Sequence, residues 1–227
     1  SLVPMMGVLG AFVFAAQMVN FAIPLTGSSG HLGGGLILAI LLGPHAAFLT
    51  IASVLTVQAL FFADGGLLAL GCNMFNLGFF PAFVAYPLIY RTVAGDRRGN
   101  SRAWVAAIAA AVAGLQCGAF AVVLETTASG MSDLPFRTFV LMMQPIHLAI
   151  GVVEGISTAA VVSFIASARP AALPAAPDGG AAAGPRPVLI GLAIAAVALG
   201  GVASWFASTR PDGLEWAVAG TAGKEEV

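Results

Sequence analysis

A short polar loop in this otherwise apolar chain ends in a histidine that could bind a metal ion. The loop reads Thr26-Gly27-Ser28-Ser29-Gly30-His31 and lies between two long apolar segments. Glycine lets a backbone bend without Cβ clashes, and neutral imidazole is the commonest protein ligand for divalent transition metals. His31 is therefore the first candidate metal ligand. The alternative is a simple turn that leaves the ring in solvent.

A second histidine and a carboxylate share one helix face further along the chain. His147 follows Gln144-Pro145-Ile146, and Glu154 lies seven residues later, about two helical turns deeper on the same side. His147 is either a second candidate ligand or an interfacial ring bonded to a backbone carbonyl. A carboxylate at the depth of Glu154 needs a partner inside the bundle. Glu154 is therefore either a relay or gate, or a hydrogen-bonded link between two helices.

Three other polar side chains are candidate supports for a metal site. Asp64, before Gly65-Gly66, either caps a helix or accepts a hydrogen bond that orients the candidate ligand His31. Asn73 and Asn76 are three residues apart, so their amides share a helix face. Amides inside a bundle join helices or hold loops, and we expect these two to hold the loop 26–31.

We expect structural roles for several other polar and sulfur-containing residues. Gln17 and Asn20 have the same spacing of three as the asparagine pair, and we expect the same role for them. His45 follows a Gly-Pro pair, and we expect it at the membrane interface. Cys72 and Cys117 lie in apolar runs, where thiols behave as small buried hydrophobes.

The composition identifies an integral membrane protein. The chain has 227 residues, of which 59% are hydrophobic and 8% are Asp, Glu, Lys or Arg, against about 25% charged residues in soluble domains. The net charge of −1 provides no electrostatic footprint for nucleic acid. The single lysine is Lys224, and the sequence has neither a G-x-x-x-x-G-K-[ST] nor an H-E-x-x-H motif. We therefore expect neither an ATPase nor another enzyme.

The apolar segments predict an all-α bundle of six or seven transmembrane helices, since a spanning helix needs about 20 apolar residues. Pro81 and Pro87 should kink the fourth segment, and Pro145 should divide the sixth into a lead-in and a helix over 146–168. The second segment is short, and it is either shielded by neighbouring helices or re-entrant. The predicted segments are 3–25, 32–43, 45–63, 67–90, 103–124, 138–168 and 187–208.

These segments suggest three parts: a membrane metal-capture domain over 1–168, a Pro/Ala/Gly-rich flexible linker over 169–186, and a transmembrane helix with a polar tail over 187–227. Four arginines lie within the loop 91–102, which the positive-inside rule places in the cytoplasm. If the second apolar segment spans the membrane, His31 faces away from the cytoplasm, together with Asp64 and the tail. If that segment is re-entrant, the histidine moves to the cytoplasmic side.

Five stretches and the tail resemble a known family. They resemble the substrate-capture component of the energy-coupling-factor (ECF) transporters for cobalt and nickel, the CbiM/NikM-like family, over about residues 5–165. The tail Pro211-Asp212-Gly213-Leu214-Glu215 resembles a small domain that accompanies this family as a fused or separate subunit. The five stretches are GAFVFAAQMVNF at 10–21, GSSGH at 27–31, QALFFADGG at 58–66, NMFNLG at 73–78 and HLAIGVVEG at 147–155.

The resemblance implies a metal site near the outer face of a helical bundle. In the family, the ion is held by a roughly planar set of nitrogens: the free N-terminal amine, the backbone nitrogen and imidazole of a second-position histidine, and the imidazole of the glycine-loop histidine. Only the last maps onto this sequence, as His31. The chain starts Ser1-Leu2, so the family's leading Met-His segment has no counterpart here. We expect a truncated copy; the alternative is that His147 or another group substitutes.

We therefore interpret the chain as the substrate-binding component of an ECF-type ABC transporter in the cell membrane, binding Co²⁺ or Ni²⁺ for uptake. Cobalt supply would serve cobalamin biosynthesis, and no organic cofactor is expected. The implied partners are a transmembrane coupling protein, two cytoplasmic ATPases, a small accessory membrane subunit and membrane lipid. Nitrogen ligands favour these ions over Mg²⁺ and Ca²⁺. The alternative function is a structural or assembly subunit of a membrane complex, without an ion site of its own.

Overall fold

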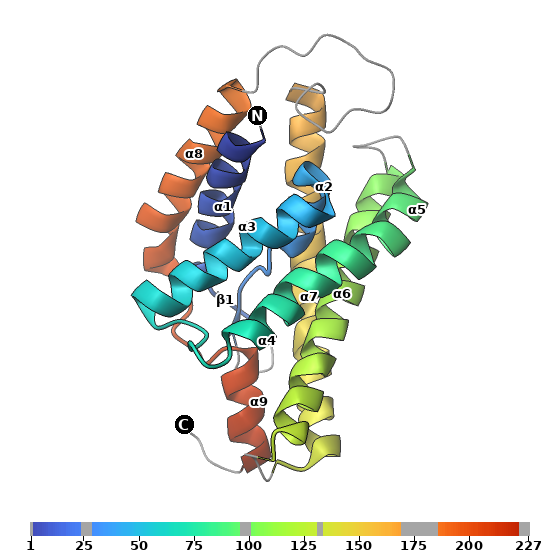
Figure 1. Cartoon of the computed structure of the whole chain (residues 1–227), viewed down its shortest axis with the longest axis vertical. Helices are drawn as coiled ribbons and strands as arrows, with labels where there is room; N and C mark the ends of the chain where they lie inside the picture. Colours follow the sequence, from blue (N-terminus) through green and yellow to red (C-terminus); the bar gives the residue numbers. More distant parts are fainter. Residues whose placement is uncertain (1, 24–28, 96–100, 131–133, 169–185, 223–227) are drawn as a thin grey trace.

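The computed structural model describes residues 2–23, 29–95, 101–130, 134–168 and 186–222. Within these residues the chain is almost entirely helical, with a single pair of two-residue strands (Figure 1). In chain order the elements are α1 (Val3–Gln17), β1 (Phe21–Ala22), β2 (Ser29–Gly30), α2 (Gly35–Leu42), α3 (Pro44–Val57), η1 (Gln58–Phe62), α4 (Leu70–Met74), η2 (Phe75–Tyr90), α5 (Arg91–Ala94), α6 (Ser101–Ala128), α7 (Phe136–Ala168), α8 (Arg186–Gly201), η4 (Ala203–Phe206) and α9 (Gly213–Ala222).

The prediction of an all-α, multi-pass membrane protein is confirmed, although the described residues contain fewer spanning stretches than the six or seven predicted. Helix α1 is apolar, but its 15 residues are fewer than the about 20 that a spanning helix needs. The predicted linker 169–186 lies outside the described residues except for Arg186. Within the described residues, five helical stretches are long and apolar enough to cross a bilayer: Pro44–Phe62, Leu70–Ala94, Ser101–Ala128, Phe136–Ser167 and Leu189–Phe206.

The first helix is shorter than the predicted segment 3–25. α1 ends at Gln17, and the chain then extends so that Phe21 pairs with Gly30 and Ala22 pairs with Ser29 in an antiparallel ladder. An extended ladder residue cannot also be helical, so this pairing sets the end of the helix. The ladder brings the chain that precedes His31 back beside the end of α1.

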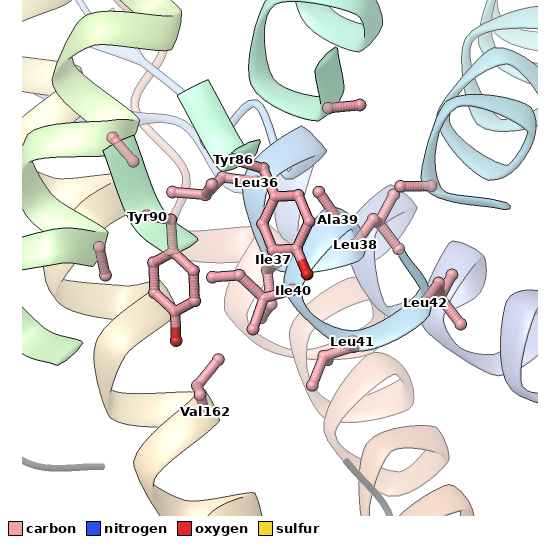
Figure 2. Close-up of a cluster of buried hydrophobic side chains, with 14 of the residues drawn as sticks. Leu36, Ile37, Leu38, Ala39, Ile40, Leu41, Leu42, Tyr86, Tyr90 and Val162 are labelled. Atoms are coloured by element: carbon pink, nitrogen blue, oxygen red, sulfur yellow. The ribbon is translucent and has the colours of Figure 1, made fainter. Parts of the chain in front are cut away.

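The second apolar segment forms a short helix inside the protein. α2 has eight residues and therefore rises only about 12 Å, too little to cross a bilayer alone. Every one of its residues is buried, as expected for a helix that is apolar on all sides. Figure 2 shows the side chains of Leu36–Leu42 beside Tyr86 and Tyr90 of η2 and Val162 of α7. Neighbouring helices thus shield this segment, which was one of the two expectations for it.

The three prolines predicted to interrupt helices all lie inside helical stretches. Pro81 and Pro87 lie within η2, a run of wide π-helical turns over Phe75–Tyr90. The predicted division at Pro145 is wrong, because α7 continues through it for 33 residues. A proline removes one backbone hydrogen bond, and neighbouring helices make that loss tolerable within a membrane bundle.

Small residues allow α6 and α7 to pack closely. A Cβ at Gly155 would lie 2.4 Å from the Ile108 Cα, and a Cβ at Gly151 would lie 2.8 Å from the Val112 Cα. Both glycines therefore sit directly against the backbone of α6. α8 packs on α1, while α9 packs on α7 in the lower part of the bundle (Figure 1). Helix α7 is therefore held between α6 and α9.

The two ends of the bundle differ in their elements. Figure 1 places α5, which begins at Arg91, toward the upper end, and β1 and α9 in the lower half. His31 and Asp64, at the beginning of α2 and after η1, line one common cavity. The chain leaves this cavity through α2 and comes back to it through α3 and η1, so His31 and Asp64 lie at the same end of the bundle. The site therefore lies away from the arginine-rich end that the positive-inside rule predicts to be cytoplasmic.

Candidate metal centre

The chain around His31 is clamped onto one face of α7. A Cβ at Gly30 would lie 2.6 Å from Ile150 Cδ1, so only glycine allows this approach. Glu154, one helical turn after the isoleucine, accepts hydrogen bonds from the N–H groups of Gly33 (2.8 Å) and Gly34 (3.1 Å). The depth argument for Glu154 is thus confirmed, because it is buried with a partner in the bundle.

The Glu154 carboxyl group caps α2 from another helix. Gly34 is the N-cap residue of α2, has φ = +76° and makes no side-chain cap of its own. A Cβ at Gly34 would also lie 2.4 Å from Val13 Cγ1, so glycine is required here for space as well as for backbone angle. The carboxyl group occupies the positive end of the helix dipole. Of the two expectations for Glu154, the structure supports the link between helices.

The Gly33 peptide is held on both sides. Its carbonyl accepts a 2.8 Å hydrogen bond from Gln17 Nε2, opposite the bond from its N–H to Glu154. Gln17 Oε1 in turn accepts a 2.8 Å bond from Gln58 Nε2, and all three of these side chains are buried. Gln17 was predicted to hold the loop 26–31, but its amide group instead holds Gly33, two residues beyond His31. Three elements, α1, η1 and α7, therefore fix the backbone beside the candidate ligand.

A backbone carbonyl holds one nitrogen of the His31 ring. Its Nδ1 lies 3.1 Å from the Leu32 carbonyl oxygen. A carbonyl only accepts hydrogen bonds, so Nδ1 donates, and the lone pair of the neutral ring is on Nε2. Metal-binding histidines commonly donate their second nitrogen to a carbonyl in this way. The backbone thus performs the orienting role considered for Asp64.

His147 makes the same kind of contact and lines the same cavity. Its Nδ1 donates to the Met143 carbonyl at 2.8 Å, which leaves the lone pair on Nε2. The backbone-bonded ring expected for His147 is therefore present. The ring also lines the same cavity as His31, so it has a place at the candidate site as well.

One cavity of about 240 Å³ collects most of the predicted site residues. One water molecule needs only about 10–15 Å³ of cavity volume, so this cavity has room for a metal ion and several waters. Glu154 is not part of this wall, because it points to the beginning of α2. The polar and charged side chains on the wall are Gln17, His31, Gln58, Asp64, Asn73, Asn76, His147 and Asp212.

Among the described residues, the two asparagine amides donate to other segments and not to residues 29–31 of the loop that they were predicted to hold. Asn73 Nδ2 donates to the Gly65 carbonyl, and Asn76 Nδ2 donates to Glu125 Oε2 of α6, both at 2.8 Å. Helix α4 begins at Leu70 without a side-chain cap, so the capping role predicted for Asp64 is wrong. Asn73 instead secures the glycine turn after Asp64. Asn20 contacts Ser208 through its backbone carbonyl.

Asn76 presents an unsatisfied acceptor. Its Oδ1 is buried and has no hydrogen-bond partner within the described part of the chain. Burying such an acceptor without a donor costs about 1–3 kcal/mol. Since Asn76 lines the cavity, a donor located there would remove this cost.

The remaining candidates lie outside the cavity. His45 is exposed and makes an edge-on contact with Phe83 at 5.4 Å. Cys72 is exposed, so its predicted burial is wrong, while Cys117 is half-buried. Within the ranges that the structure describes, no three His, Cys, Asp or Glu side chains come together as a metal-binding group.

Sequence comparison identifies the family. Residues 1–172 match the CbiM family, described as the cobalt uptake substrate-specific transmembrane region. The chain belongs to this family. Residues 186–227 match a second family, the PDGLE domain. The bundle from α1 to α7 thus lies in the CbiM match, which we call the CbiM unit, and α8 to α9 lie in the PDGLE match, which we call the PDGLE unit. Both units contribute residues to the cavity wall.

Individual relatives agree with this assignment. The chain is 41% identical over 169 residues to the putative fused nickel transport protein NikMN of Archaeoglobus fulgidus, covering 74% of this chain and 55% of that protein. It therefore spans about half the length of that relative. It is 32% identical over 171 residues to the cobalt transport protein CbiM of Sorangium cellulosum, covering 74% of each.

A solved structure shares the fold. The crystal structure described as a truncated transition metal transporter matches with a TM-score of 0.62 and 32% identity. The match covers 74% of this chain and 81% of the solved chain. The helical architecture found here is therefore that of a known membrane protein.

Sequence reasoning missed two contributors to the cavity. Gln58 stands out in the sequence only as part of the stretch 58–66, and Asp212 only as part of the tail. Asp212 and Glu215 form a capping box at the start of α9, a pattern that the spacing D-x-x-E could have revealed. The position of Asp212 on the cavity could not have been found this way, since it depends on contacts between segments distant in sequence.

Proposed function

We propose that this chain binds Co²⁺ or Ni²⁺ in the cavity beside His31 and serves as the substrate-binding membrane component of an ECF-type ABC transporter. The observation that carries the proposal is the His31 ring itself, whose Nδ1 is held by the Leu32 carbonyl and whose Nε2 lone pair is left for an ion. The names of the related proteins, which refer to cobalt and nickel transport, support the choice of ions.

The chemistry of the cavity favours a partly hydrated transition-metal ion. Imidazole nitrogens suit Co²⁺ and Ni²⁺, whereas Mg²⁺ and Ca²⁺ prefer oxygen ligands. The buried Asn76 Oδ1 needs a hydrogen-bond donor, and a water bound to the ion would supply one. Asp64 adds a carboxylate to the same wall, which favours a cation.

The proposal extends to partners. Families of this kind supply membrane components that are normally not enzymes, so we assign ATP hydrolysis to two cytoplasmic ATPases, joined to this chain through a transmembrane coupling protein. Cobalt taken up in this way would serve cobalamin biosynthesis. The PDGLE unit takes the place of a small accessory subunit.

Metal titration of the purified full chain tests the proposal. We expect saturable binding of Co²⁺ and Ni²⁺, no competition from millimolar Mg²⁺ or Ca²⁺, and an affinity that falls as the pH is lowered. The sign follows because a protonated imidazole has no lone pair for a metal, so protons compete with the ion. Isothermal titration at several pH values measures all three properties.

The alternative, a structural subunit without an ion site, is favoured by the lack of a three-residue metal group within the described ranges. It predicts no saturable Co²⁺ or Ni²⁺ binding in the same titration. Binding that Mg²⁺ displaces equally well would also contradict our proposal.

A further inference from the structure

A segment near the C-terminus reaches the cavity wall and is hydrogen-bonded to the chain beside His31. We name residues 207–213 the C-terminal strap. Ser29 donates through its N–H to the Pro211 carbonyl at 2.7 Å, and through its hydroxyl to the Arg210 carbonyl at 2.7 Å. The Ser208 N–H donates to the Asn20 carbonyl at 2.8 Å. The PDGLE unit is thus bound to both sides of the β1–β2 ladder.

The end of the strap lies against His147. A Cβ at Gly213 would be 3.2 Å from His147 Cε1 and 3.7 Å from Nε2, and it would be 2.9 Å from Ile146 Cγ2. Glycine at this position lets the strap backbone approach the imidazole edge. Asp212 directly precedes this glycine, and it lines the same cavity as His147.

The capping role of Asp212 leaves part of its carboxylate unused. Asp212 Oδ1 accepts a 2.8 Å bond from the Glu215 N–H, and Glu215 Oε2 accepts a 3.2 Å bond from the Asp212 N–H. An ionised carboxylate has about four lone-pair sites on two oxygens, so the cap leaves Oδ2 available. Asp212 is half-buried, which allows an ion from solvent to reach it.

We propose that His147 and Asp212 form an ion-relay point, where an entering Co²⁺ or Ni²⁺ ion is held by His147 Nε2 and the Asp212 carboxylate before it reaches His31. Water supplies the other ligands. Two protein ligands bind such an ion weakly, which suits passage rather than storage. This inference rests on the proposed function, and it assigns the PDGLE unit a direct part in ion entry.

The rate of Co²⁺ binding to the full chain in lipid nanodiscs tests the relay, followed by stopped-flow quenching of tryptophan fluorescence. Asp212→Asn keeps the helix cap, because asparagine caps as well as aspartate, but it removes the anionic ligand. We expect its association rate to fall at least about fivefold. The equilibrium affinity should change less than about twofold, because a relay alters entry and exit rates together.

Glu215→Gln is the matched control. It removes one negative charge from the same turn, keeps an acceptor for the capping box, and lies off the cavity wall. Its association rate should stay within about twofold of wild type, since only the general field changes. Equal slowing by Asp212→Asn and Glu215→Gln, or no slowing by either, contradicts the relay.

His147→Gln tests the other half of the relay. We expect slowing similar to that of Asp212→Asn, and no further slowing in the double variant, since both act on one ion. Additive slowing contradicts the inference. Failure of the proposed function is distinguishable, because the wild-type chain would then not bind Co²⁺ saturably, whereas failure of the relay alone leaves that binding intact.

Discussion

His31→Ala is expected to lower the affinity of the full chain for Co²⁺ and Ni²⁺ at least about 100-fold. Loss of a residue that only hydrogen-bonds to a metal ligand already lowers metal affinity about 10–100-fold, and loss of the ligand itself should cost more. Gln17 and Glu154 hold the Gly33 peptide, two residues after this histidine, from both sides. Alanine removes the Nε2 donor without disturbing that clamp. Isothermal titration of wild type and variant measures the effect.

His45→Ala is the matched control for the loss of an imidazole. His45 is exposed beside Phe83 and does not line the cavity, so its removal should leave the metal affinity unchanged. Wild-type affinity in the His31→Ala variant would remove His31 from the site. A similar loss in both would point to a general effect on the protein rather than on one ligand.

Glu154→Ala is expected to destabilise the protein by about 2–5 kcal/mol, because it leaves two buried N–H groups without an acceptor. Those groups belong to Gly33 and Gly34, where α2 begins. The variant should melt at a lower temperature and bind Co²⁺ more weakly, since the backbone beside His31 loses its anchor. Melting followed by circular dichroism in detergent measures the stability.

Glu154→Gln separates hydrogen bonding from charge. Glutamine keeps one carbonyl acceptor for these N–H groups, so it should destabilise clearly less than alanine does. If alanine leaves the melting temperature unchanged, the carboxyl group does not hold α2. If glutamine melts as low as alanine, charge matters more than the hydrogen bonds.

The elements with the strongest sequence signals were predicted well. Long apolar runs in the sequence predicted the spanning stretches that begin at Pro44, Leu70 and Ser101. A run of about 20 apolar residues is typical of a transmembrane helix. The spacing of seven between His147 and Glu154 correctly placed both on one face of α7, toward the strand and turn that carry His31. Helical periodicity alone was enough for that result.

Features that depend on tertiary partners were not predictable. The capping of α2 by Glu154 depends on a contact across 121 residues, and nothing local to Gly33 or Gly34 indicates it. Asn73 and Asn76 were placed on a helix, but their partners lie on other segments. Pro145 was read as a break because local rules count the lost hydrogen bond and not the packing that offsets it.

Anomalous diffraction from Co²⁺-loaded crystals of the full chain tests the cavity most directly. We predict a single strong cobalt peak in the cavity, within bonding distance of His31 Nε2, and loss of that peak in the His31→Ala variant. A peak elsewhere in the protein, or an unchanged peak in the variant, would contradict the assignment of this cavity as the ion site.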